Sequence, residues 1–245
     1  MPELSIVIPF YNEEACCIKV LSLLVTELDR QGVNYELLPV NNGSTDQTGT
    51  LLAKFSESHD RIKVVTVQNN EGYGWGILSG LRHSTGFYTG YMDGDAQISP
   101  ESLLRIYSRL KTSGADVCKA TRATRFDGWQ RKSVSRIFNT LFRMLFLCPI
   151  TDINAKPKIM RQSCLLSLNL DSKDWFIDAE LMLKASARKL SIEEVEIEFL
   201  PRKEGSSKVR LSTMVEFTRN IVRYFLLSRK KGIAPSRSVP QSPHV

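Results

Sequence analysis

The sequence lacks the residue patterns that build zinc sites, disulfide frameworks and membrane spans. Its three histidines lie far apart, and none of its five cysteines pairs with another at zinc-ligand spacing. The odd number of cysteines argues against a disulfide framework, so we expect a reducing, cytoplasmic compartment. No window of about 20 residues lacks charge, so we expect no membrane span. The first residues lack a basic stretch followed by an apolar run, so we expect no secretory signal.

Acidic residues are fewer than basic ones, which leaves a net charge of +7 over 245 residues. The excess positive charge lies mostly after about residue 119. It favours anionic partners, such as nucleic acid, a membrane surface or phosphorylated substrates. The sequence contains no recognised nucleic-acid-binding motif, so we expect no nucleic-acid partner.

Short apolar runs alternate with helical patterns through most of the chain. Strands are expected at residues 4–9, 35–40, 62–67, 87–92, 116–120 and 192–199. Pro9 is expected to end the first strand, and Asn12 to cap the helix that follows. This alternation predicts an α/β fold, with a mostly parallel, Rossmann-like sheet and helices on both faces.

The end of the fourth predicted strand carries a cluster of oxygen donors. If this end stays extended, Asp93, Asp95 and Gln97 project to the same side. Such donors suit a divalent cation that carries a phosphorylated ligand, although Asp-x-Asp is also common in surface turns. Polar loops at 11–13 and 41–46 are expected at the same edge of the sheet, where ligands of parallel sheets bind. The three loops together favour the ligand-binding interpretation.

Two amphipathic helices are predicted in the C-terminal half. The helix at 133–147 suits either the protein core or a bilayer interface. The basic helix at 213–229 suits an anionic membrane surface or a partner protein, and the alternative is packing on the domain. We therefore expect a domain at 1–211, an amphipathic C-terminal helix at 212–233 and a disordered tail at 234–245.

Five motifs occur in a fixed order along the chain: residues 5–14, 42–46, 93–97, 129–132 and 202–208. Together they resemble glycosyltransferase family 2, in its dolichol-phosphate mannose synthase-like branch, the polyprenyl-phosphate glycosyltransferases. The resemblance covers about residues 4–210. It implies a GT-A fold, a nucleotide-sugar donor, Mg²⁺ or Mn²⁺ as cofactor, and a lipid-phosphate acceptor.

The resemblance also implies roles for individual residues. Nucleotide-sugar binding falls to Pro9, Tyr11, Glu13, Asn41, Asp93, Asp95 and Arg202. The metal ligands are Asp93, Asp95 and Gln97. The acceptor phosphate is held by Arg122, Arg131, Ser207 and Lys208. Catalysis falls to Asp95, Arg202 and Lys208.

The chain departs from the family pattern at two places. Asn41 and Asn42 stand where the family usually has two aspartates, and an asparagine can donate as well as accept hydrogen bonds. The base therefore stays open between uracil and guanine, and the donor between UDP- and GDP-sugars. At 152–158, many relatives have a glycine-aromatic pair that is absent here, so the sugar is left open too.

These features predict metal-dependent, inverting transfer of a sugar from a nucleotide-sugar to a polyprenyl phosphate. A phosphate acceptor is already largely ionised near neutral pH and needs no strong base. One alternative is transfer to a soluble or hydroxyl acceptor, for which Asp178 or Glu180 would be the base; both also suit ordinary helix-start charges. A nucleotidyltransferase of similar architecture belongs to the same alternative. Another is a catalytically silent nucleotide-binding homologue. We expect a peripheral protein at the cytoplasmic face of a membrane, with a membrane protein as a candidate anchor.

Overall fold

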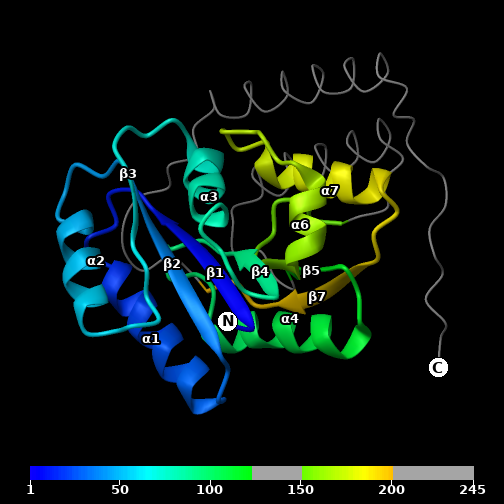
Figure 1. The fold of residues 1–245 in the computed structure, drawn as a ribbon, viewed down its shortest axis with the longest axis horizontal. Coiled ribbons are helices and arrows are strands. Elements are labelled where there is room, and N and C mark those ends of the chain that lie inside the picture. Colours follow the sequence, from blue (N-terminus) through cyan, green and yellow to red (C-terminus); the bar gives the residue numbers. More distant parts are fainter. Residues whose placement is uncertain (123–150, 201–245) are drawn as a thin grey trace.

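A computed structural model describes residues 1–122 and 151–200, which form a seven-stranded sheet between two layers of helices (Figure 1). The strands are β1 (Leu4–Phe10), β2 (Tyr35–Asn42), β3 (Val65–Val67), β4 (Tyr88–Tyr91), β5 (Val117–Arg122), β6 (Lys158–Arg161) and β7 (Ile192–Ile197). The helices are α1 (Cys17–Arg30), α2 (Thr48–Glu57), α3 (Tyr73–Leu81), α4 (Pro100–Ser113), α6 (Gln162–Leu168) and α7 (Ile177–Ala187).

The strands lie in the order β3-β2-β1-β4-β6-β5-β7. Only β6 runs against its neighbours, β4 and β5, and the other described pairs are parallel. The predicted mostly parallel sheet is therefore confirmed. Gly90 allows the close approach of β4 to β6, because a Cβ atom there would lie 2.3 Å from the backbone oxygen of Lys158.

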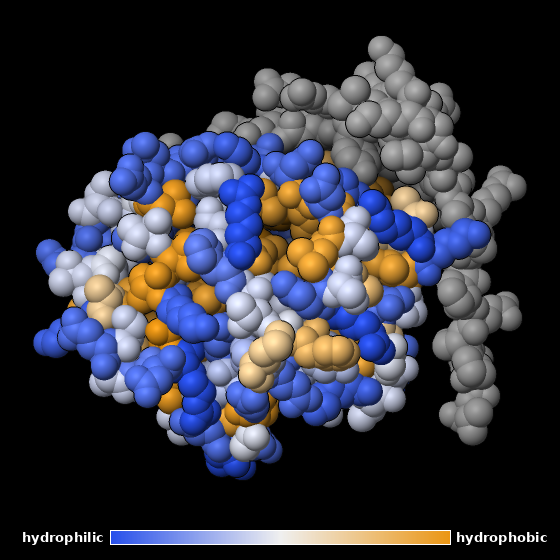
Figure 2. All heavy atoms as spheres, viewed as in Figure 1, coloured by the Kyte–Doolittle hydropathy of each residue, from blue (hydrophilic) through white to orange (hydrophobic). Residues whose placement is uncertain are grey.

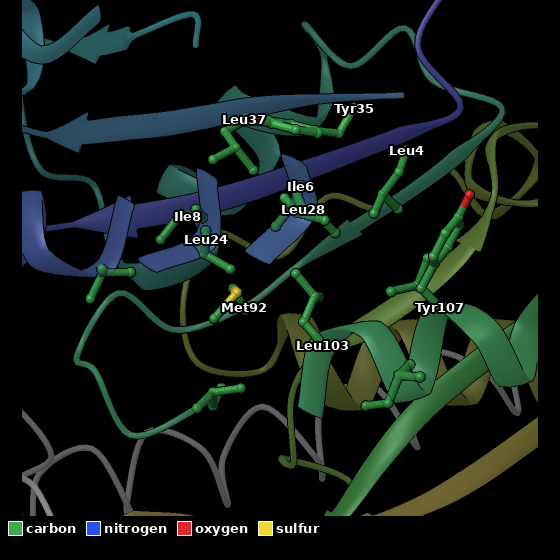
Figure 3. Packing of buried hydrophobic residues seen from close by; sticks show 14 of the residues in the cluster. Leu4, Ile6, Ile8, Leu24, Leu28, Tyr35, Leu37, Met92, Leu103 and Tyr107 are labelled. Carbon is green, nitrogen blue, oxygen red and sulfur yellow. The ribbon is translucent and has the colours of Figure 1, made fainter. Parts of the chain in front are cut away.

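Alternating side chains of β1 and β2 enter two separate cores. Ile6 and Ile8 pack with α1 and α4 on one face, as Figure 3 shows, whereas Val7 packs with α3 and α7 on the other. Both faces of these strands are buried, which explains their continuous apolar sequence. The prediction of helices on both faces is confirmed.

Two boundary predictions at the start of the chain are wrong. Pro9 does not end β1, which continues to Phe10. Pairing of β1 with β4 stops at Val7, so the missing N–H of Pro9 interrupts no ladder on that side. Asn12 does not cap α1, which begins at Cys17. Instead Asn12 has a φ of 52°, and its side-chain oxygen accepts a hydrogen bond from the backbone N–H of Thr45 at 2.8 Å.

Several elements differ from the sequence-based expectation. The third strand is limited to Val65–Val67, with one isolated bridge at Ile62. Strand β6 and helix α6 were not predicted, because a four-residue segment that begins and ends in a charged residue has little apolar pattern. The predicted helices at 133–147 and 213–229, the domain end at 211 and the tail at 234–245 lie outside the described residues.

The surface of the described part is mixed in character. The face seen in Figure 2 carries hydrophobic residues scattered among hydrophilic ones. Within residues 1–122 and 151–200, every helix is too short or too polar to cross a membrane.

Candidate functional site

The candidate site lies at one edge of the sheet, where β1, β2, β4 and β5 end. Strand β6 is antiparallel, so its first residues lie at this same edge. The loops after β1, β2 and β4 contact one another here. Asn12 bonds Thr45 across the first two loops, and the Cys16 thiol lies 3.5 Å from the backbone oxygen of Gly94 in the third. The predicted meeting of the three polar loops is therefore confirmed.

The segment from Asp93 to Gln97 is a turn and not an extended strand end. Strand β4 stops at Tyr91, and Ala96 has a φ of 60°. The backbone N–H of Gln97 donates to Asp95 Oδ1 at 3.2 Å, which closes the turn. The argument from alternation along a strand is thus wrong, because the turn, and not the pleat, sets the directions of these side chains.

Gln97 is tied to the end of the described chain. Its side-chain Nε2 donates to the backbone oxygen of Leu200 at 2.9 Å, and the backbone N–H of Leu200 donates to the backbone oxygen of Gln97 at 2.9 Å. The NH₂ group of a side-chain amide only donates hydrogen bonds, so Oε1 is the side-chain atom of Gln97 that can bind a cation.

Two donors, a tyrosine hydroxyl and a lysine ammonium group, contact the Asp93 carboxylate. The Tyr73 hydroxyl donates to Asp93 Oδ1 at 2.7 Å, and Lys156 Nζ lies 3.3 Å from the same oxygen. Burial, followed by the charge of Asp93, raises the pKa of Tyr73 well above its usual value, so the hydroxyl keeps its proton and donates. The Asp93 side chain is 24% exposed. Both contacts fall on Oδ1, which leaves Oδ2 for a ligand.

The donor set at this edge fits a cation shared with a phosphorylated ligand. Nowhere in residues 1–122 and 151–200 do three His, Cys, Asp or Glu side chains form a metal-binding group. Asp95 and Gln97 offer one carboxylate and one amide oxygen, while Asp93 is bound through Oδ1. Mg²⁺ typically takes one or two carboxylates, with substrate phosphates and water completing its shell. The residues therefore fit such an ion only together with its ligand.

A buried cluster of charges is connected to Asp93 through Lys156. The Asp178 carboxylate, 1% exposed, contacts Lys156 at 3.3 Å, accepts a hydrogen bond from the Tyr91 hydroxyl at 2.7 Å and pairs closely with Lys158. Burial alone would raise the pKa of Asp178, but the two ammonium groups outweigh it and hold the pKa below its usual value. Burial lowers the pKa of Lys158 to about 8.

Neither Asp178 nor Glu180 has the surroundings of a general base. Asp178 is committed to two lysines. Glu180 is fully buried, accepts hydrogen bonds from the backbone N–H groups of Asp171 and Ser172, and pairs with Lys184. It therefore holds the loop after α6. The hypothesis of either residue as a base for a hydroxyl acceptor loses its support.

The two asparagines at the end of β2 have different environments. Asn42 is 3% exposed and donates from Nδ2 to the backbone oxygen of Gly72 at 3.0 Å. Asn41 is half-buried, and its Oδ1 accepts a hydrogen bond from the backbone N–H of Ser44 at 3.1 Å. Asn42 is therefore a packing residue, and Asn41 is the one that borders the loop.

The remaining predicted nucleotide residues lie around the first loop. Pro9 is in β1, and Tyr11 is 37% exposed directly after this strand. The Glu13 backbone N–H donates to the Thr48 hydroxyl at 2.9 Å, and its carboxylate lies 3.4 Å from the Cys16 thiol. Burial, followed by the charge of Glu13, raises the pKa of Cys16 to about 12, so this thiol is not a nucleophile at neutral pH.

Arg122 is the predicted acceptor residue that the structure describes. It ends β5, and its Nε lies 3.3 Å from Asp152 Oδ2. Its guanidinium lies 5.1 Å from the centre of the Phe199 ring. The other predicted phosphate-contacting residues lie outside the described residues: Arg131, Arg202, Ser207 and Lys208.

Sequence reasoning missed Tyr73, Lys156 and Lys158 as members of this site. Lysine is usually read as a surface residue, so the burial of both lysines was not expected. A usable signal is the Lys-Pro-Lys triplet, which precedes a short apolar run and could be matched with a distant acidic residue.

Comparison with known proteins agrees with the fold. The family model described as "Glycosyl transferase family 2" matches residues 5–172. The undecaprenyl-phosphate 4-deoxy-4-formamido-L-arabinose transferases of Edwardsiella ictaluri (strain 93-146) and Enterobacter sp. (strain 638) are 26% and 27% identical over 220 and 222 residues. These alignments cover 89% and 90% of this chain. The chain spans 66% of the length of each relative.

Solved structures of glucosyl-3-phosphoglycerate synthase match the fold of this chain. Glucosyl-3-phosphoglycerate synthase from Mycobacterium tuberculosis, in complex with Mn²⁺, UDP and phosphoglyceric acid, superposes with a TM-score of 0.73 at 21% sequence identity. The match covers 98% of this chain and 80% of that one. A complex of the same synthase with Mg²⁺ and UDP gives 0.71 at 20% identity, with 96% and 81% covered. The predicted GT-A fold is therefore confirmed.

Proposed function

This chain belongs to glycosyl transferase family 2, and we propose that it transfers a sugar from a nucleotide-sugar to a polyprenyl phosphate. The observation that carries the proposal is the turn at Asp93–Gln97, joined to the loops after β1 and β2 at one edge of the sheet. The names of the curated relatives support a lipid phosphate as the acceptor. A synthase of the same fold was solved with Mn²⁺ and UDP, which supports a divalent metal ion and a nucleotide-sugar as the proposed ligands.

In this proposal, Asp95 and Gln97 hold Mg²⁺ or Mn²⁺, and Asp93 contacts the nucleotide-sugar beside it. Such a cation, when bound, offsets the negative charge that develops on the leaving diphosphate. The first loop, with Pro9 and Tyr11, borders the nucleotide. Arg202 and Lys208, from outside the described residues, complete the proposed diphosphate contacts.

The acceptor phosphate needs orientation more than deprotonation. Its oxygen is already anionic near neutral pH and can attack the anomeric carbon directly, which inverts the configuration there. Arg122 lies at the end of β5 to orient it, and Arg131 and Ser207 are the further proposed contacts. The burial of Asp178 and Glu180 favours this acceptor over a hydroxyl, which would need a base.

A donor panel tests the proposal. The protein is incubated with UDP- and GDP-sugars, polyprenyl phosphate and Mn²⁺, and the product is extracted into organic solvent. We expect label from one donor class to enter the organic phase only when both metal and lipid phosphate are present. Label that appears in water-soluble product alone would reject the lipid acceptor, and no transfer from any donor would favour a catalytically silent homologue.

We also propose that the protein is peripheral at the cytoplasmic face of a membrane, since its acceptor is a lipid. The basic pattern at 213–229 supports an anionic surface as partner, and a membrane protein is a further candidate anchor. We expect the protein to float with anionic liposomes at low salt and to be released at high salt, because screening weakens surface attraction. Equal flotation with neutral liposomes at both salt concentrations would contradict this electrostatic mode of binding.

A further inference from the structure

The Asp93 carboxylate is oriented by groups from two distant parts of the chain. Tyr73 belongs to the first turn of α3, and Lys156 precedes β6. Both contact Oδ1, at 2.7 Å and 3.3 Å. A carboxylate that is bound at one oxygen by two donors is restricted in rotation, so its second oxygen points in a defined direction.

Lys156 is itself held in place from three sides. Its Nζ lies 3.3 Å from Asp93 Oδ1, 3.3 Å from Asp178 Oδ2 and 4.6 Å from the centre of the Tyr73 ring. That ring stacks on Trp175 at 4.4 Å, with an angle of 6° between the two planes. The lysine is 6% exposed. Its ammonium group therefore connects the buried Asp178 to the partly exposed Asp93.

The charges explain why this connection persists. Two carboxylates, those of Asp178 and Asp93, each lie 3.3 Å from the Lys156 ammonium group and balance its buried charge. Asp178 has a second cation in Lys158, so it does not depend on Lys156 alone for its charge balance. Among the described residues, in contrast, Lys156 is the one cation within 4.0 Å of the Asp93 carboxylate.

We propose that Lys156, anchored by Asp178, is a positioning residue that orients Asp93 toward the nucleotide-sugar. Tyr73 contributes the second contact. The inference rests on the proposed function, because it takes Asp93 as a nucleotide-sugar contact. It assigns Asp178 a role through Lys156 and not in proton transfer. It also gives a purpose to the Lys-Pro-Lys segment at 156–158, where the chain departs from the family pattern.

The test compares Lys156→Met and Lys156→Arg with the wild type. The methionine keeps the length of the side chain without its charge, and arginine restores the charge. Binding of UDP and GDP, each with Mn²⁺, is measured by calorimetry, and KM and kcat are measured with the donor found in the panel. We expect Lys156→Met to weaken nucleotide binding and raise the donor KM by about tenfold, since a hydrogen bond to a charged group is lost. Lys156→Arg should recover most of the binding.

Lys63→Met is the matched control, because it removes a lysine from an ion pair away from the site. Lys63 lies 2.8 Å from Glu36, which also accepts a hydrogen bond from the backbone N–H of Thr85 before β4. This pair therefore lies at the opposite, amino-terminal edge of the sheet. The control should bind nucleotide as the wild type does.

Tyr73→Phe is a second variant. It removes only a hydroxyl group, so we expect it to disturb folding less than Lys156→Met does. It should also weaken nucleotide binding, and the double variant Tyr73→Phe/Lys156→Met should lose less than the two single effects combined. A crystal structure of Lys156→Met should show Asp93 in more than one side-chain conformation. If Lys156→Met fails to fold, unchanged binding in Tyr73→Phe overturns the inference.

The outcomes separate this inference from the proposed function. If the wild type binds UDP or GDP with Mn²⁺ and Lys156→Met binds as tightly, the positioning role is wrong and the proposed function stands. If the wild type binds neither nucleotide and transfers no sugar, the proposed function is rejected and the inference with it. An equal loss in Lys63→Met would show that the effect is a general consequence of losing a lysine.

Discussion

Replacing Asp95 with alanine is expected to lower kcat/KM for sugar transfer by about 10³-fold, while the thermal stability of the protein changes little. The carboxylate is the proposed metal ligand, and its loss removes several kcal/mol of stabilisation from the developing diphosphate charge. The substitution removes the hydrogen bond that Asp95 Oδ1 accepts from the Gln97 backbone N–H, which lies in a partly exposed turn. Transfer is measured against Mn²⁺ concentration, and unfolding by calorimetry.

Asp60→Ala is the control for this substitution. Asp60 is exposed and precedes β3, so it lies at the opposite edge of the sheet from Asp95. The control should keep wild-type activity at every Mn²⁺ concentration. Full turnover by Asp95→Ala with the same donor would show that this carboxylate is not a metal ligand.

Replacing Asp178 with alanine is expected to lower the free energy of unfolding by about 3–5 kcal/mol, because it leaves Lys158 buried without its carboxylate. The Tyr91 hydroxyl loses its acceptor as well. Denaturant unfolding measures the effect. A catalytic base would give the opposite result, with a large loss of kcat and little change in stability. Asp171→Ala, in which an 84% exposed side chain is removed, should change the stability by less than about 0.5 kcal/mol.

The Asp178→Ala deficit should also depend on pH. Lys158 has a folded pKa of about 8, below the ordinary value, and loss of Asp178 lowers it further. A lysine whose folded pKa lies below its unfolded pKa adds stability as the pH rises from the first value to the second. In the variant this rise begins at a lower pH than in the wild type. The difference in stability should therefore shrink as the pH rises toward about 8, and a constant difference would contradict the role given to Lys158.

The inner strands of the sheet and the edge where the three loops meet could be predicted from the local apolar pattern of the sequence. The apolar runs around Ile6 and Leu37 are buried on both faces, so their sequence alone identifies them as inner strands. The rule that parallel strands end at one edge then brought the loop at Asp93 next to the loops after β1 and β2. Chain direction and burial were enough for this much of the candidate site.

The remainder of the site depends on contacts between distant residues. Asn12 has a good capping side chain, but its hydrogen bond to Thr45 replaces the cap. Lys158 is fully buried because Asp178 and Tyr91 lie beside it, and neither is near it in sequence. No periodicity in the segment around Lys158 indicates this burial. Those contacts also explain why β6 was missed and why Asp178 was weighed as a base.

The reversed direction of β6 has a consequence for how such proteins can diversify. The described chain stops at Arg122 and resumes at Thr151, and the Arg122 backbone N–H donates to the Asp152 carboxylate at 3.2 Å. Residues 123–150 are thus attached at two neighbouring points beside the site. In general, doubling the length of a flexible connection adds only about 0.6 kcal/mol to the cost of closing it, so two neighbouring attachment points tolerate connections of different length. Arg131, our proposed acceptor contact, lies between these two points in the sequence, so we expect an exchange of residues 123–150 between relatives to change acceptor preference and to leave the loops after β1, β2 and β4 intact.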